Sequence, residues 1–400
     1  MLSSIDQVSI KKKVKIAITP LKAGVMLYRH MKGCERELSI LGFGCMRLPT
    51  NEDSSINEAL AKKVIRHAID CGVNYIDTAY PYHNGQSEPF VGRVLKDGYR
   101  ERVNLATKLP SWLIGTREDM DKYLGEQLER LQTDHIDFYL VHGLNKTSWG
   151  KLEELGVREF LDEAVRDGRI KYAGFSFHDD IKTFKRIVDS YDWTFCQIQY
   201  NFMDEAFQAG TAGLHYAASK GLGVIAMEPL RGGLLSRDLP GLREIWSKAK
   251  FSVTPTEWGL RWVWNHPEIT VVLSGMNTMD QVKENLRTAE EGLPESLSKE
   301  DLGLFSKIKS FYRKRMKIDC SGCGYCMPCP NGVDIPECFN RYNNAFAYDD
   351  ADNAKRLYTM FLSKEGYASS CKKCGTCVKV CPQHIAIPEK LKEVADFFGK

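Results

Sequence analysis

The chain of 400 residues lacks any long apolar stretch, and no run approaches the roughly 18 uninterrupted apolar residues that a membrane-spanning helix requires. Its N-terminus is basic around residues 11–15 but has neither the apolar core nor the cleavage site of a secretory signal. The chain also lacks an excess of charge of either sign, because 55 lysines and arginines are balanced by 52 aspartates and glutamates, which leaves a formal net charge of +3. This balance provides no electrostatic footprint for nucleic acid or an acidic membrane. We therefore expect a cytoplasmic protein with a small-molecule or protein partner and with neither nucleic acid nor membrane among its partners.

Cysteine, by contrast, is abundant, with 13 residues of this type. In a short secreted chain they would predict disulfides, but in a long chain without a signal sequence, CxxC spacing favours metal ligands. The length suits a barrel of about 250 residues with a smaller appendage. Two main domains are expected.

Short apolar segments alternate with amphipathic helical segments from residue 39 to residue 291. The segment 136–143 is a continuous apolar run ending in histidine and glycine, which is typical of a buried parallel strand. Strands are predicted over 39–45, 74–80, 103–109, 136–143, 172–177, 195–201, 224–230 and 270–274. Helices are predicted between them, including one over about 151–168. Eight strand–helix units predict a closed (β/α)8 TIM barrel, since an open doubly wound sheet usually stops at five or six strands.

Catalytic residues of such a barrel lie at the carboxyl ends of its strands. Those ends carry Asp77 and Tyr82 after the second strand, Lys108 at the third and His142 at the fourth. A neighbouring lysine stabilises a phenolate, and a buried aspartate holds that lysine in place. Tyr82 is therefore expected to donate a proton to a carbonyl oxygen while a hydride reaches the carbon, with His142 orienting the oxygen. Each residue alone also fits a structural role, such as a strand cap or a core histidine, but the combination favours catalysis.

Several motifs over roughly residues 26–292 resemble those of the aldo-keto reductase family and follow its order. They are LGFGCMR at 41–47, DTAYPY at 77–82, ATK at 106–108, LVH at 140–142, GFS at 174–176, QIQYN at 197–201 and EN at 284–285. The family's five-residue offset from Asp77 selects Tyr82 over Tyr80. The resemblance implies an oxidoreductase that transfers a hydride between a nicotinamide cofactor and a carbonyl or alcohol substrate.

The same resemblance implies cofactor-binding residues by matching position. Ser176 and Gln197 would hold the carboxamide, Gly44, Cys45 and Met46 would lie along the cofactor, and Gly275, Gln281 and Asn285 would meet its adenosine end. Met227 stands where the family commonly stacks an aromatic ring on the nicotinamide, and a soft thioether is able to cover that ring. The basic and hydroxyl residues that mark NADP preference are absent from the matched positions. The choice between NADP and NAD stays open, and flavin-assisted chemistry is a further alternative.

Two cysteine runs near the C-terminus are the strongest local signals. They consist of Cys320, Cys323, Cys326 and Cys329 before a proline, and of Cys371, Cys374, Cys377 and Cys381 before another. The second run has ferredoxin-type spacing, in which the fourth cysteine reaches the other cluster. The runs resemble ferredoxin-like domains with two [4Fe-4S] clusters, and a similar tail follows the barrel in an iron–sulfur subgroup of the aldo-keto reductases. The resemblance implies one cluster on Cys320, Cys323, Cys326 and Cys381, and another on Cys371, Cys374, Cys377 and Cys329.

Other interpretations of the cysteines stay open. A single cluster with a partly vestigial first run is one alternative, and four-cysteine zinc sites are another. The remaining five cysteines, Cys34, Cys45, Cys71, Cys196 and Cys338, have no such spacing and are expected to be small buried or incidental residues.

The predicted organisation has four parts. These are an N-terminal extension (1–25), a barrel (26–295), a connecting helix (296–319) and a small, mainly α-helical, ferredoxin-like iron–sulfur domain (320–400). A hydride carries two electrons, whereas a cubane passes one. We therefore expect an aldo-keto reductase-type enzyme whose carbonyl chemistry accompanies or is coupled to electron exchange with a ferredoxin-like partner. The alternative is a redox sensor or electron carrier whose barrel turns over little.

Overall fold

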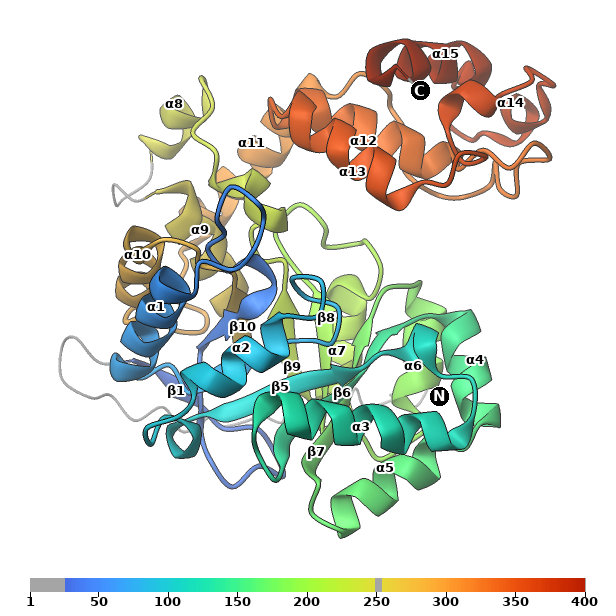
Figure 1. Ribbon diagram of the computed structural model, residues 1–400. Coiled ribbons are helices and arrows are strands. Elements are labelled where there is room, and N and C mark those ends of the chain that lie inside the picture. Colours follow the sequence, from blue (N-terminus) through green and yellow to red (C-terminus); the bar gives the residue numbers. More distant parts are fainter. Residues whose placement is uncertain (1–25, 249–253, 400) are drawn as a thin grey trace, which may run out of the picture. The chain divides into compact units, whose positions relative to one another are not determined.

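The computed structural model describes residues 26–248 and 254–399 and consists of two compact units (Figure 1). Within the described residues, the first unit runs to Gly232 and includes Thr256–Leu297, and the second contains Gly233–Pro255 and the chain from Ser298 onward. The predicted N-terminal extension, residues 1–25, lies outside the described residues.

The first unit is built on a closed barrel of eight parallel strands, which confirms the predicted (β/α)8 fold. Around the barrel the strands follow the order β10-β3-β4-β5-β6-β7-β8-β9. The strands are β3 (Leu41–Gly44), β4 (Tyr75–Asp77), β5 (Asn104–Leu109), β6 (Ile136–Leu144), β7 (Ile170–Phe177), β8 (Phe195–Gln199), β9 (Gly223–Met227) and β10 (Ile269–Ser274). Because the strands are parallel, all their carboxyl ends meet at one edge of the barrel.

Several helices of the first unit begin at side chains that accept hydrogen bonds from their first turn. Asn57 accepts from the N–H of Leu60, and Thr116 forms a reciprocal capping box with Asp119. The helices are α1 (Glu58–Asp70), α2 (Ser87–Val94), α3 (Arg117–Leu131), α4 (Lys146–Glu154), α5 (Val157–Arg166), α6 (Ile181–Val188), α7 (Gly210–Ser219), α9 (Pro255–Trp264) and α10 (Met279–Ala289). Short 3-10 helices are η1 (Cys45–Arg47), η2 (Arg100–Arg102), η3 (Ser111–Leu113) and η4 (Arg231–Ser236).

The continuous helix predicted over 151–168 is wrong. The chain forms α4 and α5 instead, and they are separated at Gly156. Gly156 has a φ of 78°, in the left-handed region that glycine adopts without a steric penalty. Its conformation ends one helix and starts another at a position where apolar periodicity alone shows no interruption.

An antiparallel hairpin, β1 (Tyr28–Arg29) with β2 (Leu38–Ser39), lies against the amino end of the barrel. The buried Arg29 guanidinium donates to the carbonyl oxygens of Trp264 at 2.6 Å and Gly292 at 3.2 Å. Met31, from the loop of the hairpin, belongs to the same buried cluster as Phe138 and Phe195 inside the barrel. The hairpin therefore closes the end of the barrel opposite the predicted site.

The second unit is mainly helical. Its core includes Phe339, Tyr358, Leu391 and Phe398, all with at most 1 % of their surface exposed. Its helices are α8 (Leu242–Trp246), α11 (Lys299–Arg315), α12 (Ile335–Ala347), α13 (Ala351–Phe361), α14 (Thr376–Val380) and α15 (Ile387–Phe398), with the 3-10 helix η5 (Ala368–Ser370). This small helical unit carries both cysteine runs.

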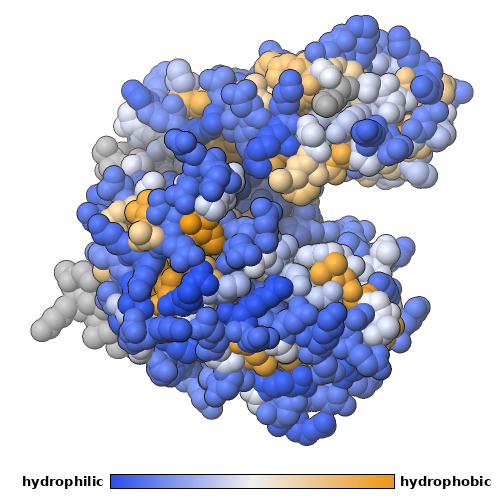
Figure 2. Space-filling view, viewed as in Figure 1, coloured by the Kyte–Doolittle hydropathy of each residue, from blue (hydrophilic) through white to orange (hydrophobic). Residues whose placement is uncertain are grey.

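The face of the molecule in Figure 2 is mainly hydrophilic and is interrupted by small separate hydrophobic patches. In the part of the chain that the structure describes, no helix combines the length and apolarity needed to span a bilayer.

Candidate functional site

A buried ion pair lies at the carboxyl edge of the barrel. Asp77 is the last residue of β4, and Lys108 is the penultimate residue of β5. The Lys108 ammonium donates to both carboxylate oxygens of Asp77 at 2.8 Å and to the carbonyl oxygen of Thr78 at 2.7 Å. The Lys108 side chain has no exposed surface, and that of Asp77 is 4 % exposed. The three acceptors fix the position of the ammonium group.

Tyr82 and His142 complete the group of four predicted catalytic residues. The Lys108 ammonium lies 5.0 Å from the centroid of the Tyr82 ring, and the rings of Tyr82 and His142 are 6.2 Å apart at nearly perpendicular orientation. Trp112, which is 52 % exposed, lies with its ring centroid 5.2 Å from that of His142. The structure thus brings all four residues together from three neighbouring strands and the loop after β4.

The neighbouring Tyr80 faces a different environment. Its hydroxyl donates to the carboxylate of Glu126 at 3.2 Å and accepts from Arg130 at 3.1 Å, both on α3. The Arg130 guanidinium also lies 4.1 Å from the centre of the Tyr80 ring. Tyr80 is therefore held by the outer helix, and Tyr82 is the tyrosine beside Lys108.

The electrostatic environment of the site keeps the Tyr82 hydroxyl protonated at neutral pH. Burial raises the pKa of Tyr82, and the Lys108 ammonium opposes this rise without cancelling it. Burial lowers the pKa of Lys108, but Asp77 and Tyr82 together outweigh it, so the pKa of Lys108 is raised overall. Burial, Lys108 and His178 lower the pKa of His142 well below 6.5. At neutral pH the site therefore holds a protonated tyrosine, a cationic lysine and a neutral histidine.

The residues predicted around the nicotinamide, Ser176, Gln197 and Met227, lie next to each other on β7, β8 and β9. Ser176 pairs with Gln197 across the two strands, and its hydroxyl oxygen accepts from the N–H of Gly143 at 2.7 Å. The Gln197 amide donates to the sulfur of Met227 at 3.4 Å, while its buried carbonyl oxygen has no hydrogen-bond partner among the described residues. A buried acceptor without a partner is costly unless a ligand satisfies it. An incoming amide N–H, such as that of a carboxamide, fits this position.

The residues predicted at the adenosine end show a second buried acceptor without a partner. Asn285 on α10 donates to the hydroxyl of Ser274 at 2.9 Å, and no partner of its side-chain oxygen is found in the part of the chain that the structure describes. The side-chain oxygen of Gln281 accepts from the N–H of Asn277 at 2.8 Å, so it stabilises its own loop. The environments of Gln197 and Asn285 thus fit a bound dinucleotide better than that of Gln281.

Arg47, at the end of the predicted cofactor segment, lies close to two glycines, Gly232 and Gly275. A Cβ atom added to Gly232 would lie 2.7 Å from an Arg47 guanidinium nitrogen, and one added to Gly275 would lie 3.1 Å from Cβ of Arg47. Of the predicted neighbours on η1, Cys45 is buried and Met46 is 59 % exposed. Arg47 and Gly232 were not among the predicted site residues. The position of Arg47, directly after the Gly44–Met46 segment assigned to the cofactor, was the available signal.

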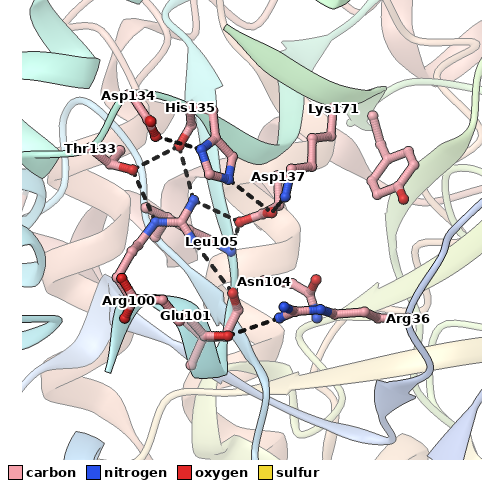
Figure 3. Close-up of polar contacts among 12 residues, drawn as sticks. Arg36, Arg100, Glu101, Asn104, Leu105, Thr133, Asp134, His135, Asp137 and Lys171 are labelled. Carbon is pink, nitrogen blue, oxygen red and sulfur yellow. Dashed lines mark hydrogen bonds and ion pairs between the residues drawn. The ribbon is translucent and has the colours of Figure 1, made fainter. Parts of the chain in front are cut away.

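A second polar cluster lies at the opposite, amino end of the strands (Figure 3). Its centre is Asp137, near the start of β6, which accepts from the N–H of Leu105 at 2.9 Å and pairs with Lys171 and Arg100 at 2.8 Å each. Arg100 and Lys171 thus both neutralise the buried carboxylate of Asp137. Because this end of a TIM barrel contributes stability and the site lies at the other end, we assign the cluster a structural role.

In the second unit the structure brings cysteines of the two runs together. Cys381 lines one pocket with Cys320, Cys323 and Cys326. Cys329 is an electrostatic neighbour of Cys377, together with Cys371 and Cys374. The fourth cysteine of each run thus lies with the first three of the other, which is the arrangement that the ferredoxin-type resemblance implies.

The thiols do not converge as ligands of a single ion. Among residues 26–248 and 254–399, no group of three or more histidine, cysteine, aspartate or glutamate side chains is placed to hold one metal ion.

Comparisons with known proteins agree with this division. Residues 40–300 match the profile described as the aldo/keto reductase family, and residues 319–386 match a 4Fe-4S dicluster domain. The uncharacterized oxidoreductase YrpG of Bacillus subtilis (strain 168) is 27% identical over 327 residues, which cover 71% of this chain and 96% of that protein. The L-galactose dehydrogenase of Arabidopsis thaliana is 28% identical over 287 residues, covering 64% and 85% of the two chains.

Among solved structures, the holo form of the aldo-keto reductase AKR11C1 from Bacillus halodurans is similar to the first unit. It is 27% identical with a TM-score of 0.60, and the match covers 70% of this chain and 96% of that one.

Proposed function

The chain belongs to the aldo/keto reductase family and carries a 4Fe-4S dicluster domain, and from this premise we propose that it interconverts carbonyl and alcohol groups with a nicotinamide cofactor. The observation that carries the proposal is the buried Asp77–Lys108 pair with Tyr82 and His142 beside it. A cofactor-binding scaffold without chemistry would have no need to bury an ammonium group beside a tyrosine.

In the reducing direction, a carbonyl carbon gains a hydride and its oxygen gains a proton, which gives the alcohol. Tyr82 donates that proton from its hydroxyl. Lys108 stabilises the phenolate that remains, and Asp77 holds the ammonium in place. The neutral His142 orients the carbonyl oxygen. A bound nicotinamide supplies the hydride, and bound iron–sulfur clusters exchange single electrons.

The cofactor is proposed to lie across the carboxyl edge of the barrel. Ser176 and the unpaired oxygen of Gln197 hold the carboxamide, Met227 covers the ring, and the unpaired oxygen of Asn285 meets the adenosine half. Arg47, beside Gly232 and Gly275, places a cation near the path that the phosphates would take. These contacts favour a dinucleotide and do not discriminate NADP from NAD.

The cysteines of the second unit are proposed to bind two [4Fe-4S] clusters that exchange electrons with a ferredoxin-like protein. Because a hydride carries two electrons and a cluster passes one, direct coupling would require a one-electron state of the nicotinamide or an additional flavin. Electron transfer that accompanies the carbonyl chemistry without being coupled to it is the simpler arrangement.

An anaerobic titration tests the proposal. Protein with its clusters intact is mixed with NADPH or NADH, alone and with a panel of small aldehydes and ketones, while nucleotide absorbance and the broad visible absorption of the clusters are followed. We expect nucleotide oxidation that depends on a carbonyl compound. Bleaching of the visible band by nucleotide alone would show coupling and would make a flavin the next cofactor to seek. Nucleotide binding without oxidation across the panel would contradict the proposal and favour the redox sensor or electron carrier.

A further inference from the structure

The two cysteine runs differ sharply in charge. Between Gly366 and Pro388, around the second run, the sequence has three lysines and no aspartate or glutamate. These are Lys372, Lys373 and Lys379, and all three side chains are exposed. By contrast, the segment from Cys320 to Val333 has no charged residue and is flanked by Asp319 and Asp334.

The three lysines lie close to the cysteine ligands. Lys372 and Lys373 stand between Cys371 and Cys374, and Lys379 stands between Cys377 and Cys381. The main-chain N–H of Lys373 donates to the sulfur of Cys371 at 3.4 Å, which holds the loop backbone against the site. Each of the three lysines thus lies within two residues of a cysteine assigned to this cluster.

Exposed apolar side chains adjoin the lysines. Val378 and Val380, both on α14, have 38 % and 48 % of their surface exposed. Among the described residues, none of the three lysines appears in an ion pair, whereas Lys390 and Lys392 on α15 pair with Glu393 and Asp396 at 2.8 and 2.6 Å. A small apolar centre with unneutralised charges around it is typical of a transient interface.

We propose that this second-run surface, made of Lys372, Lys373, Val378, Lys379 and Val380, is the docking site of an acidic one-electron carrier protein. The inference rests on the proposed electron exchange by the clusters and specifies which run meets the partner and with what charge. In the step itself, the reduced carrier loses one electron and the cluster gains it, with no proton or atom transferred. Complementary charge steers the encounter and mainly raises its rate, so the effect weakens with salt.

The test compares two triple charge reversals that change the net charge equally. One is K372E/K373E/K379E, and the control is K355E/K390E/K392E, which alters three lysines on α13 and α15 of the same unit. A reduced acidic [2Fe-2S] ferredoxin is mixed anaerobically with each protein in a stopped-flow instrument, and bleaching of the clusters is followed from 20 to 300 mM salt. Dithionite, a small reductant that needs no docking surface, is used in parallel.

For the unchanged protein we expect a rate that falls as salt rises. The K372E/K373E/K379E variant should be at least tenfold slower at low salt and should lose this salt dependence, while the control should stay within about threefold of the unchanged protein. Both variants should bleach normally with dithionite, which shows that their clusters are intact. Equal slowing in both variants would indicate a general effect of net charge and would overturn the proposed site.

The outcomes separate this inference from the function on which it rests. If the clusters of the unchanged protein cannot be reduced even by dithionite, electron exchange itself is wrong. If dithionite reduces them but the ferredoxin does not, or the K372E/K373E/K379E variant reacts as fast as the unchanged protein, only the docking surface is overturned. Binding of the unchanged protein to vesicles of phosphatidylglycerol that weakens as salt rises and is lost in the variant, without reaction with the ferredoxin, would assign the surface to a membrane instead.

Discussion

Tyr82 experiences two opposing influences, and their balance determines its chemistry. Burial raises its pKa and the Lys108 ammonium lowers it, with burial prevailing in the free protein. The sequence suggested the stabilising lysine but not the extent of burial, because burial depends on how the loop after β4 folds over the strand ends. A tyrosine held protonated beside a cation is a proton donor whose conjugate base is stabilised when it forms.

The first prediction concerns the proton itself. Tyr82→Phe removes the donor and should lower the rate of carbonyl reduction by about 100-fold or more, the contribution typical of general acid catalysis. Nucleotide affinity, measured by quenching of protein fluorescence, should stay unchanged. Tyr80→Phe is the matched control, because the Tyr80 hydroxyl contacts Glu126 and Arg130 on α3. Comparable loss in both variants would remove the assignment of Tyr82.

The pH dependence of carbonyl reduction provides a second prediction. The pKa of His142 is lowered well below 6.5, so its imidazole is already neutral at pH 6.5 and gains a proton only at a pH well below that value. We therefore expect His142 to cause no fall in kcat near pH 6.5, so His142→Gln should leave the pH profile in this range unchanged. At high pH, activity should fall as Tyr82 loses its proton, above the ordinary tyrosine value of 10.0 because its pKa is raised. An acid limb near pH 6.5 that His142→Gln removes would contradict this assignment.

The unpaired acceptors lead to a third prediction. Gln197→Leu removes a buried oxygen that would receive the carboxamide N–H, and loss of one such hydrogen bond should weaken NADPH binding by about tenfold. Binding of adenosine 2',5'-bisphosphate, which lacks the nicotinamide, should not change. Asn285→Ala should weaken both ligands. A Gln197 variant that loses affinity for both would indicate a general disturbance of the barrel edge.

At the scale of elements, the sequence predicts the strands of the barrel and many helix starts because each depends on local chemistry. Apolar runs of strand length and caps such as Thr116 with Asp119 act within a few residues. The break at Gly156 was missed because apolar periodicity continues through it. The hairpin of β1 and β2 was missed because Arg29 is held by carbonyl groups more than 230 positions away. The proximity of Arg47 to Gly232 and Gly275 could not be predicted for the same reason, since these residues meet only after the barrel closes.

The fourth prediction concerns the polar cluster at the amino end of β5, β6 and β7. Burial would raise the pKa of Asp137, but Arg100, Lys171 and the N–H of Leu105 together hold it below its ordinary 3.8. A carboxylate with a lowered folded pKa stabilises the fold above its unfolded pKa, and this contribution is lost as pH falls through the folded value. Asp137→Asn should therefore lower the free energy of unfolding by about 2 kcal/mol at pH 5–8.

Urea unfolding across pH measures this effect. The difference between the unchanged protein and Asp137→Asn should shrink below about pH 4, where the carboxylate takes up a proton. Asp134→Asn is the control, because its side chain is 93% exposed and surface pairs contribute little. A difference that persists undiminished in acid would show that the carboxylate charge is not the source of the stability.

At the scale of the whole molecule, an aldo/keto reductase domain and a 4Fe-4S dicluster domain follow one another along the chain. The aldo/keto reductase profile and the 4Fe-4S profile match separate stretches of sequence, which shows why each part could be predicted from its own motifs. Cysteine spacing within a run is a local signal that sequence carries directly. Which cysteines of one run come to lie beside those of the other depends on how α12, α13 and α15 pack into one core. Spacing within a run does not determine that packing.

The last prediction distinguishes the two ways of assigning ligands. With two [4Fe-4S] clusters the intact protein should contain about eight irons per chain, and about four with a single cluster.

Because Cys381 lines a pocket with the first three cysteines, Cys381→Ala should change the same electron paramagnetic resonance signal as Cys320→Ala. Cys371→Ala should change a different signal, shared with Cys329→Ala. Cys338→Ala is the control and should retain all iron, because that buried thiol contacts Tyr358 and the carbonyl oxygen of Gly366 in the core. If Cys381→Ala instead matched Cys371→Ala, each run would hold its own cluster, and the cross-run arrangement would be wrong.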